Sequence, residues 1–348
     1  MTDLDKHVTE AMHRIEELYY ETDGKCYVSF SGGKDSTVLL ALIKLCEDIY
    51  TVPKDGIPAV FSNTGVELGV TLDFVRWVKE NWYPNVQIIR PEKSFDWVLK
   101  NKGKPAKSKL RAQYLGRWQH GSRTDKVTKN LVIGISNAGT RARRIVLADK
   151  DMHMLSDKFP IVLSDQCCTY LKKKPFMQYE KTNGIRGYMT GVRTAEGGAR
   201  ELNMMAVHDP KRICTFTARG LTLKKPIIDW PDGVVEEFIT KYKVPLSGAY
   251  TKYGFHRTGC MACPFNSNVD FDLNYLYHNE PNRYKAAMHW LKDVYIAQNV
   301  ELPFDAEYEA ERAKTWREVY EPMRQEMLRK YRPNSRLIKD GEQLTLFD

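Results

Sequence analysis

The stretch Ser31-Gly32-Gly33-Lys34-Asp35-Ser36 joins an apolar run, residues 25–30, to a helical pattern that begins near Ser36. The apolar run predicts a buried strand. Two adjacent glycines let the backbone turn its amides inward, and the positive end of the helix points at the same spot. Ser31 and Ser36 add hydroxyls, and Lys34 adds a cation. The pattern predicts a phosphate-binding loop, but without the spacing of a Walker motif.

Strands and helices alternate on both sides of this loop. Such alternation is typical of an α/β fold with a doubly wound parallel sheet, which binds ligands at the carboxyl ends of its strands. Expected strands are residues 25–30, 57–62, 86–90 and 187–192, and expected helices are 3–22, 37–49, 70–81 and 232–242, with a helical region over 272–331.

The chain has 348 residues, of which 42% are hydrophobic and 28% charged, so it holds enough apolar material for a packed core. It contains no run of about 18 apolar residues and no pattern of an export signal, so we expect a cytoplasmic protein without a membrane span. The expected organisation is a nucleotide-binding domain over 1–99 and 151–270, a basic insertion over 100–150, a helical part over 271–331 and a loose tail over 332–348.

The positive charge is concentrated in one segment. The net charge is +9, yet residues 100–144 alone hold thirteen Lys or Arg and a single acid, Asp125, which leaves the rest of the chain at −3. Tyr114, Trp118 and His120 stand among these charges. Because cations neutralise phosphates while rings stack on bases, the segment is expected to bind nucleic acid. A solvated loop or a lid over a nucleotide is the alternative.

Four of the seven cysteines form two pairs, Cys167-Cys168 and Cys260-Met-Ala-Cys263. Adjacent thiolates converge poorly on one tetrahedral ion, whereas a cubane cluster offers each of them its own iron. The pattern favours a 4Fe–4S cluster. Structural Zn²⁺ on the same four residues, or four unligated thiols, are the alternatives. Cys26 and Cys46 are expected in the core, and Cys214 is undecided.

The loop sequence resembles the PP-loop of the ATP pyrophosphatase superfamily. Four further motifs follow it in order, and together they resemble the phosphoadenosine phosphosulfate (PAPS) reductase family over roughly residues 24–265. These motifs are Phe61-Ser-Asn-Thr-Gly-Val-Glu67, Thr190-Gly-Val-Arg193, Lys225-Pro-Ile-Ile-Asp-Trp230 and Gly259-Cys-Met-Ala-Cys-Pro264.

The resemblance implies roles for individual residues. The loop would hold the pyrophosphate of an adenine nucleotide, and Arg193 would reach a phosphate or sulfate of the substrate. The adenosine end of the pocket would be lined by Asn63, Thr64, Gly65 and Glu67. An ordinary strand-to-helix turn at Thr64-Gly65 and a surface ion pair at Arg193 are the alternatives. The cysteine pattern is similar to the 4Fe–4S ligand set of adenylyl-sulfate reductases and DNA phosphorothioation enzymes.

Two departures from the reductases of this family bear on function. Reductases usually carry a degenerate PP-loop and a nucleophilic cysteine in a C-terminal Glu-Cys-Gly segment, whereas this loop is intact and no cysteine follows Cys263. The resemblance therefore implies cleavage of ATP to AMP and pyrophosphate, with Mg²⁺, to activate a substrate for 4Fe–4S-assisted sulfur transfer to nucleic acid. Lys34 and the loop would stabilise the departing pyrophosphate, and Asp35 would assist Mg²⁺ or cap the helix.

Two other function classes stay open. One is a PAPS or adenylyl-sulfate reductase that takes its thiol from elsewhere, and the other is a non-catalytic nucleic-acid module that senses nucleotide. The tail raises a separate expectation, because Gln343-Leu-Thr-Leu-Phe347 resembles the pentapeptide by which bacterial proteins dock on the replicative sliding clamp. Leu346 and Phe347 would fill an apolar pocket there. An apolar terminus folded back on the protein is the alternative.

Overall fold

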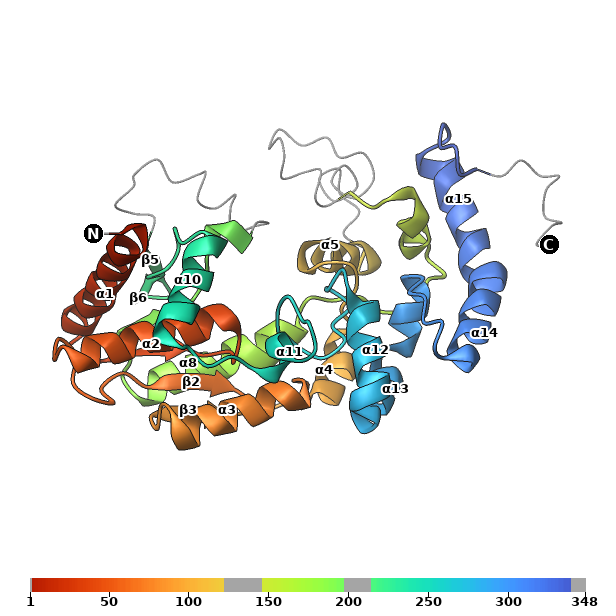
Figure 1. The fold of residues 1–348 in the computed structure, drawn as a ribbon. Coiled ribbons are helices and arrows are strands. Elements are labelled where there is room, and N and C mark those ends of the chain that lie inside the picture. Colours follow the sequence, from red (N-terminus) through yellow and green to blue (C-terminus); the bar gives the residue numbers. More distant parts are fainter. Residues whose placement is uncertain (1, 122–145, 197–213, 339–348) are drawn as a thin grey trace. The chain divides into compact units, whose positions relative to one another are not determined.

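A six-stranded sheet with the strand order β3-β2-β1-β4-β6-β5 organises the first part of the chain in the computed structural model (Figure 1). The structure describes residues 2–121, 146–196 and 214–338. Four neighbouring strand pairs are parallel, as expected from the sequence, and β1 lies between β2 and β4. The strands are β1 (Cys26–Ser29), β2 (Ala59–Ser62), β3 (Val86–Ile89), β4 (Gly187–Met189), β5 (Thr215–Ala218) and β6 (Leu221–Lys224).

The expected doubly wound α/β fold is confirmed, and its sheet is parallel except at one edge, where β5 pairs antiparallel with β6. Arg219 and Gly220 form the two-residue connection, with φ values of 56° and 78°. A tight hairpin whose twist matches its strands requires positive φ at both central residues, which glycine adopts without strain. The sheet is therefore mixed but mostly parallel.

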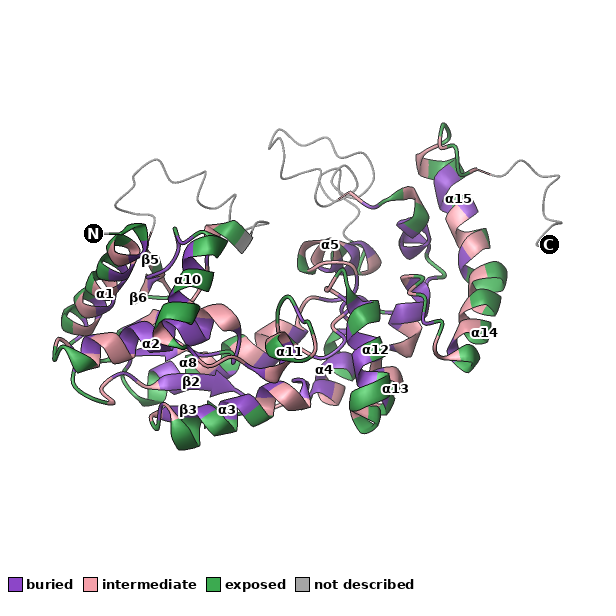
Figure 2. Ribbon diagram, viewed as in Figure 1, coloured by how far each residue is buried: buried purple, intermediate pink, exposed green. Residues whose placement is uncertain are grey.

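The central strands are buried (Figure 2), and their successive residues belong to two different cores. Cys26 and Val28 of β1 pack on one face, with α1 (Asp3–Glu21), α2 (Lys34–Asp48), α3 (Gly69–Asn81) and α10 (Asp232–Tyr242). Tyr27 points to the other face, where it packs beside residues of α8 (Lys174–Thr182). This period of two is what a strand covered on both faces requires.

The expected core positions of Cys26 and Cys46 are confirmed, since both side chains are at most 1% exposed. Burial away from water disfavours the thiolate and raises the pKa of Cys26 to about 11 and that of Cys46 to about 12. Burial therefore favours the protonated form of both thiols, which is the less nucleophilic one.

The chain divides into two compact units, each built from two separate stretches. Unit 1 comprises Met1–Glu92 and Leu171–Cys260 and contains the sheet. It also includes η4 (Thr194–Glu196), α11 (Gly248–Thr251) and, from residue 171 on, η3 (Thr169–Lys173). Unit 2 comprises Lys93–Tyr170 and Met261–Asp348 and is mainly helical in its described residues.

Unit 2 places the start of the basic segment among helices. Leu115 and Trp118 of α5 are at most 2% exposed, so this stretch has a packed face. None of the described helices of either unit is both long and apolar enough to cross a bilayer. The helices in the described residues of unit 2 are α4 (Phe95–Lys102), α5 (Lys109–Gln119), η2 (Asp149–Leu155), α12 (Val269–Asn279), α13 (Pro281–Ala297), α14 (Ala306–Thr315), η6 (Trp316–Tyr320) and α15 (Glu321–Tyr331).

Candidate functional site

The predicted phosphate-binding loop, residues 31–36, lies at the carboxyl end of β1, and both neighbours of this strand, β2 and β4, run parallel to it. The helix that follows begins at Lys34, two to three residues earlier than the sequence pattern predicts, with Gly33 in extended conformation as its N-cap. Lys34, Asp35 and Ser36 therefore form the first turn, whose amides have no partner within the helix. Gly32 has φ +70°, and a Cβ there would come within 3.1 Å of Thr71 and Val75 side-chain carbons. Only glycine fits this position without strain.

The two serines of the loop bond to the loop itself. Their hydroxyl oxygens lie 3.0 Å apart, and the Ser36 hydroxyl donates to the Gly33 carbonyl at 2.9 Å. The Gly33 amide in turn donates to the Ser31 hydroxyl at 3.3 Å. These bonds fix the curvature of the loop. Direct contact of either hydroxyl with a phosphate stays a prediction.

Arg193 is buried in ion pairs rather than open to the surface. Its side chain is 3% exposed, and Nε donates to Asp35 Oδ1 at 2.7 Å while a terminal nitrogen donates to Asp232 at 2.8 Å. Another nitrogen donates to the Trp230 carbonyl at 3.0 Å. Burial disfavours the charged guanidinium, but the two carboxylates outweigh it and raise the pKa of Arg193. Contact of Arg193 with a substrate anion stays a prediction, and in this geometry the residue positions Asp35.

Gly191, which the sequence reading did not single out, determines how closely the β4 loop approaches α2. A Cβ at this position would lie 2.7 Å from the Asp35 carbonyl oxygen and 2.9 Å from the Ser36 nitrogen, both backbone atoms. Backbone cannot swing aside as a side-chain end does, so any larger residue displaces the first turn of α2. The motif Thr190-Gly-Val-Arg193 thus contributes through its glycine as well as its arginine.

The second predicted pocket wall, residues 63–67, is organised by Glu67. Its carboxylate is 5% exposed and accepts from the Thr64 amide at 3.1 Å, the Thr64 hydroxyl at 2.5 Å and the Gly65 amide at 3.1 Å. The Asn63 side chain also accepts from the Gly65 amide, at 3.1 Å. Glu67 therefore holds the loop from within and leaves Gly65 exposed at its tip. Their contact with adenosine stays a prediction.

The segment that leads to the second cysteine pair lies against the phosphate loop. The Lys34 amide donates to the Tyr250 hydroxyl at 3.2 Å, and the Thr258 amide donates to the same oxygen at 3.3 Å. Two residues later, Cys260 pairs with Glu67 in an antiparallel bridge. The sequence reading missed Tyr250 and Thr258, because a lone tyrosine or threonine in a loop carries no motif.

The first pair, Cys167 and Cys168, directly precedes the π-helix η3. Helical turns of this kind are frequent at functional sites. Cys167 is buried, whereas Cys168 is partly exposed. All the cysteines are free thiols.

The second pair lies in a fixed turn. Ala262 has φ +46°, and its carbonyl accepts from the buried Tyr295 hydroxyl at 2.6 Å. The Asn266 amide donates to the Cys263 carbonyl at 2.7 Å.

The four cysteines have the chemistry of iron or zinc ligands. Among the residues it describes, no three His, Cys, Asp or Glu side chains are arranged to hold a metal ion. Cys260 belongs to unit 1 and the other three to unit 2. A cluster or zinc ion shared by these four residues stays a prediction.

The model of the phosphoadenosine phosphosulfate reductase domain matches residues 25–142 and 121–266, which is more than half of the chain. The chain belongs to the PAPS reductase family. This confirms the family expected from the loop and the four motifs that follow it. No protein of curated function matches the chain.

Two solved structures are similar to this PAPS reductase family member. PAPS reductase from Candida auris is 14% identical, with 75% of this chain and 96% of that chain covered and a TM-score of 0.43. The U34-tRNA thiolase NcsA from Methanococcus maripaludis, with its [4Fe-4S] cluster, is 12% identical, with 86% and 81% covered and a TM-score of 0.34. Similarity at this level does not distinguish one activity from another.

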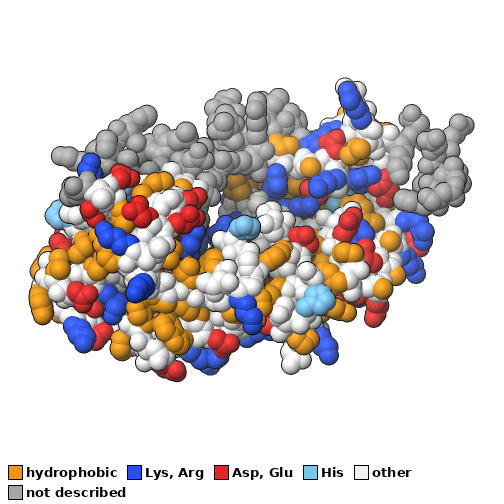
Figure 3. All heavy atoms as spheres, in the orientation of Figure 1, with side chains coloured by type: hydrophobic (Ala, Val, Ile, Leu, Met, Phe, Trp, Pro, Cys, Tyr) orange, Lys and Arg blue, Asp and Glu red, His pale blue; other side chains and the backbone are white. Residues whose placement is uncertain are grey.

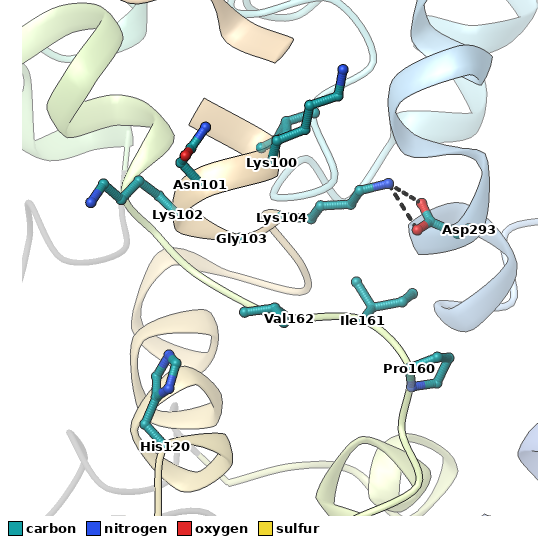
Figure 4. A pocket seen from close by; sticks show the side chains of 11 residues that line it. Lys100, Asn101, Lys102, Gly103, Lys104, His120, Pro160, Ile161, Val162 and Asp293 are labelled. Carbon is teal, nitrogen blue, oxygen red and sulfur yellow. Dashed lines mark hydrogen bonds and ion pairs between the residues drawn. The ribbon is translucent and has the colours of Figure 1, made fainter. Parts of the chain in front are cut away.

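Unit 2 of this family member contains a basic cavity of about 390 Å³ (Figure 4). It is lined by Lys100, Lys102 and Lys104 at the end of α4 and by His120 just after α5. Lys104 points to Asp293 and lies 2.8 Å from both carboxylate oxygens, whereas Lys102 points the other way.

The Lys102 ammonium lies over aromatic rings, 5.9 Å from the centre of Trp97 and 5.7 Å from that of Tyr170. Cation–π contacts with these rings position the ammonium group, but the rings carry no net negative charge that would neutralise it. Charges of both signs are interspersed over the described surface seen in Figure 3.

Seven of the thirteen basic residues of segment 100–144 fall in the described part, up to Gly121. The other six lie outside the described residues, as does the expected clamp-binding pentapeptide.

Proposed function

We propose that this PAPS reductase family member binds ATP at residues 31–36 and cleaves it to AMP and pyrophosphate, thereby activating a substrate for sulfur transfer. One observation carries the proposal. The intact loop lies at the carboxyl end of the central strand β1, and it is followed directly by the first turn of α2, whose amides have no partner within the helix itself. Parallel sheets bind ligands at this edge, and helix N-termini favour phosphates.

The proposed chemistry has two steps. An oxygen of the acceptor attacks the α-phosphorus of ATP, the bond from that phosphorus to the bridging oxygen breaks, and pyrophosphate leaves with the bonding electrons. A sulfur nucleophile at the oxidation level of sulfide then attacks the acceptor carbon and expels AMP. Charge accumulates on pyrophosphate in the first step. Preorganised donors that face this charge lower the barrier, and these would be the loop amides and Lys34.

Mg²⁺ is proposed to accompany ATP, because nucleotide sites usually bind this ion through one or two carboxylates and the phosphates of the substrate. Asp35 is the carboxylate nearest the loop amides in sequence, and its position is fixed by Arg193. An immobilised carboxylate is a suitable outer ligand for a hydrated Mg²⁺ ion, which retains several waters.

A 4Fe–4S cluster on Cys167, Cys168, Cys260 and Cys263 is the proposed cofactor, with Zn²⁺ as the alternative. The supporting observation is the set of four free thiols in the order Cys-Cys and Cys-x-x-Cys. We expect anaerobically purified protein to contain about four iron and four sulfide per chain. Loss of the iron in Cys260→Ser but not in Cys214→Ser would support these ligands, whereas stoichiometric zinc would exclude the cluster.

Nucleic acid is the proposed acceptor. The basic cavity of unit 2, with Lys102 fixed over Trp97 and Tyr170, supports this because phosphate contacts by lysine dominate nucleic-acid affinity.

Docking on a sliding clamp through residues 343–347 is proposed from the sequence alone. Deletion of residues 343–348 should abolish capture by purified clamp, and unchanged capture would contradict it.

The activity is tested with labelled ATP in full-length, anaerobically purified protein. Release of pyrophosphate in the presence of acceptor supports the proposal, whereas sulfite from a sulfonucleotide would support a reductase instead. Lys34→Ala should abolish pyrophosphate release and weaken ATP binding at least tenfold. Lys44→Ala is the matched control, because Lys44 lies on the same helix but its ammonium contacts the Trp82 carbonyl and ring.

A further inference from the structure

The backbone amide of Lys34, the first residue of α2, donates a hydrogen bond to a side chain that is distant in sequence within unit 1. The Lys34 amide donates to the Tyr250 hydroxyl at 3.2 Å, across 216 positions of sequence. This amide is one of the orphan donors at the helix N-terminus, the group that binds a phosphate oxygen in such loops. The tyrosine oxygen therefore lies where a phosphate oxygen would lie.

Gly33 permits this approach. A Cβ at residue 33 would lie 3.0 Å from the Thr258 hydroxyl oxygen and 3.3 Å from the Tyr250 hydroxyl oxygen. The two hydroxyls are 3.2 Å apart. They form a small polar wall, that is, two adjacent hydroxyl groups that face the loop at Gly33, where the loop has no side chain.

The same wall is continuous with the other side of the predicted pocket. The Thr258 amide donates to the Tyr250 hydroxyl, and Cys260, two residues on, pairs with Glu67. Glu67 holds the Thr64 and Gly65 amides. One short segment therefore contacts both loops that are expected to grip the nucleotide, and it ends at a cysteine of the predicted ligand set.

We propose that the Tyr250 hydroxyl is a placeholder, that is, a group that occupies the hydrogen-bonding position of a nucleotide phosphate oxygen. Displacement of this hydroxyl by ATP loosens the Thr258–Cys260 segment and so transmits the effect of nucleotide binding to Cys260. The inference rests on the proposed function, since it requires that ATP binds at this loop. It adds two residues to the phosphate site and gives them a role in coupling that site to the cysteine.

The exchange is favourable on physical grounds. The tyrosine bond to Lys34 is neutral and at the long end of the usual range for N–H···O bonds. A phosphate oxygen forms a charge-assisted bond, which is shorter and about twice as strong. When the tyrosine moves, the Thr258 amide loses its partner as well, because both amides share one oxygen.

The test measures affinity and hydrogen exchange on full-length, anaerobically purified protein with Mg²⁺ and α,β-methylene-ATP, which cannot be cleaved at the relevant bond. In the wild type we expect slower exchange in the peptide around residues 31–40 and faster exchange around 250–260 on binding. Tyr250→Phe should bind the analogue about three- to tenfold more tightly, because no hydroxyl has to be displaced. Its 250–260 peptide should exchange rapidly with or without nucleotide.

Tyr242→Phe is the matched control, because Tyr242 is also half-buried in unit 1 and its hydroxyl makes no hydrogen bond to the residues that the structure describes. It should behave as the wild type in both measurements. Unchanged or weaker binding by Tyr250→Phe, or protection of residues 31–40 without any change at 250–260, would overturn the placeholder while leaving ATP binding intact. If the wild type shows no protection at 31–40, both the inference and the proposed function fail.

Discussion

The Nε atom of Arg193 lies 2.7 Å from Asp35 Oδ1, across 158 positions of sequence. This bond connects the loop after β4 to the first turn of α2. Because the guanidinium is 3% exposed and also bonds Asp232, it holds Asp35 in one orientation within the predicted phosphate-binding loop. The relationship makes Arg193 a positioning residue, with consequences that can be measured.

Arg193→Met should lower the free energy of unfolding by about 3 kcal/mol, the lower end of the usual cost of removing one partner of a buried ion pair. The lower end applies because Asp232 stays largely exposed to water. Chemical denaturation measures the change. Arg186→Met is the control, since the ion pair of Arg186 with Asp23 is exposed, and it should cost at most about 1 kcal/mol. Equal losses in the two variants would contradict the assignment.

Gly191→Ala should displace the first turn of α2 and weaken ATP binding by tenfold or more. The added Cβ meets backbone atoms of Asp35 and Ser36 at 2.7–2.9 Å, which cannot move without moving the loop. Isothermal titration with the ATP analogue measures the effect. Gly233→Ala tests the specificity of the result, because a Cβ there meets nothing within 4 Å. That change should preserve binding and stabilise α10 by up to about 1 kcal/mol.

Glu67→Gln should destabilise unit 1 by about 1–3 kcal/mol and weaken binding of adenine nucleotides. An amide can accept on one side only, so at least one of the donors from Thr64 and Gly65 is left unpaired in a buried position. Denaturation and titration report the two effects. The exposed Glu236→Gln on α10 should change neither. A fully stable Glu67→Gln variant would show that the carboxylate does not organise the loop.

His153 should make the stability of the protein fall in acid. It is fully buried in unit 2, where Nε2 lies 2.9 Å from the Ala297 carbonyl oxygen, and burial lowers its pKa to about 3. The unfolded chain protonates this group near pH 6.5, so between about pH 6.5 and 3 unfolding takes up a proton. The free energy of unfolding therefore falls as pH falls through this window, by about 1.4 kcal/mol per pH unit from this group.

In His153→Phe the slope of stability against pH should be shallower by this amount in that window, whatever the overall loss of stability. Denaturation curves collected from pH 7 to pH 4 give the slope. Parallel curves for the variant and the wild type would contradict the prediction.

The sequence was sufficient for those features that depend on local pattern. The apolar run before Ser31 and the glycines after it predicted a strand, a loop and a helix, and the structure has them in that order. The helix starts earlier than predicted because Gly33 itself acts as the N-cap. The antiparallel edge carried a signal at Arg219-Gly220 that a search for hairpin turns would have found.

The partners of the site residues could not be predicted, because they depend on long-range packing. Nothing near Arg193 in the sequence indicates Asp35, and nothing near Lys34 indicates Tyr250. The cysteines also show that sequence does not predict long-range contacts. Their spacing favours a shared site, but spacing does not fix whether thiols separated by 91 residues converge.

The sheet order has a consequence for biosynthesis. β1 is paired with β2 early in the chain, but its other neighbour, β4, begins only at Gly187. Until the ribosome has made that segment, the newly made N-terminal part has an apolar strand edge that no partner covers, which is a site for unwanted association between chains. Slow translation or premature termination before residue 187 should therefore yield material that aggregates, and chaperone protection matters most during that interval of synthesis.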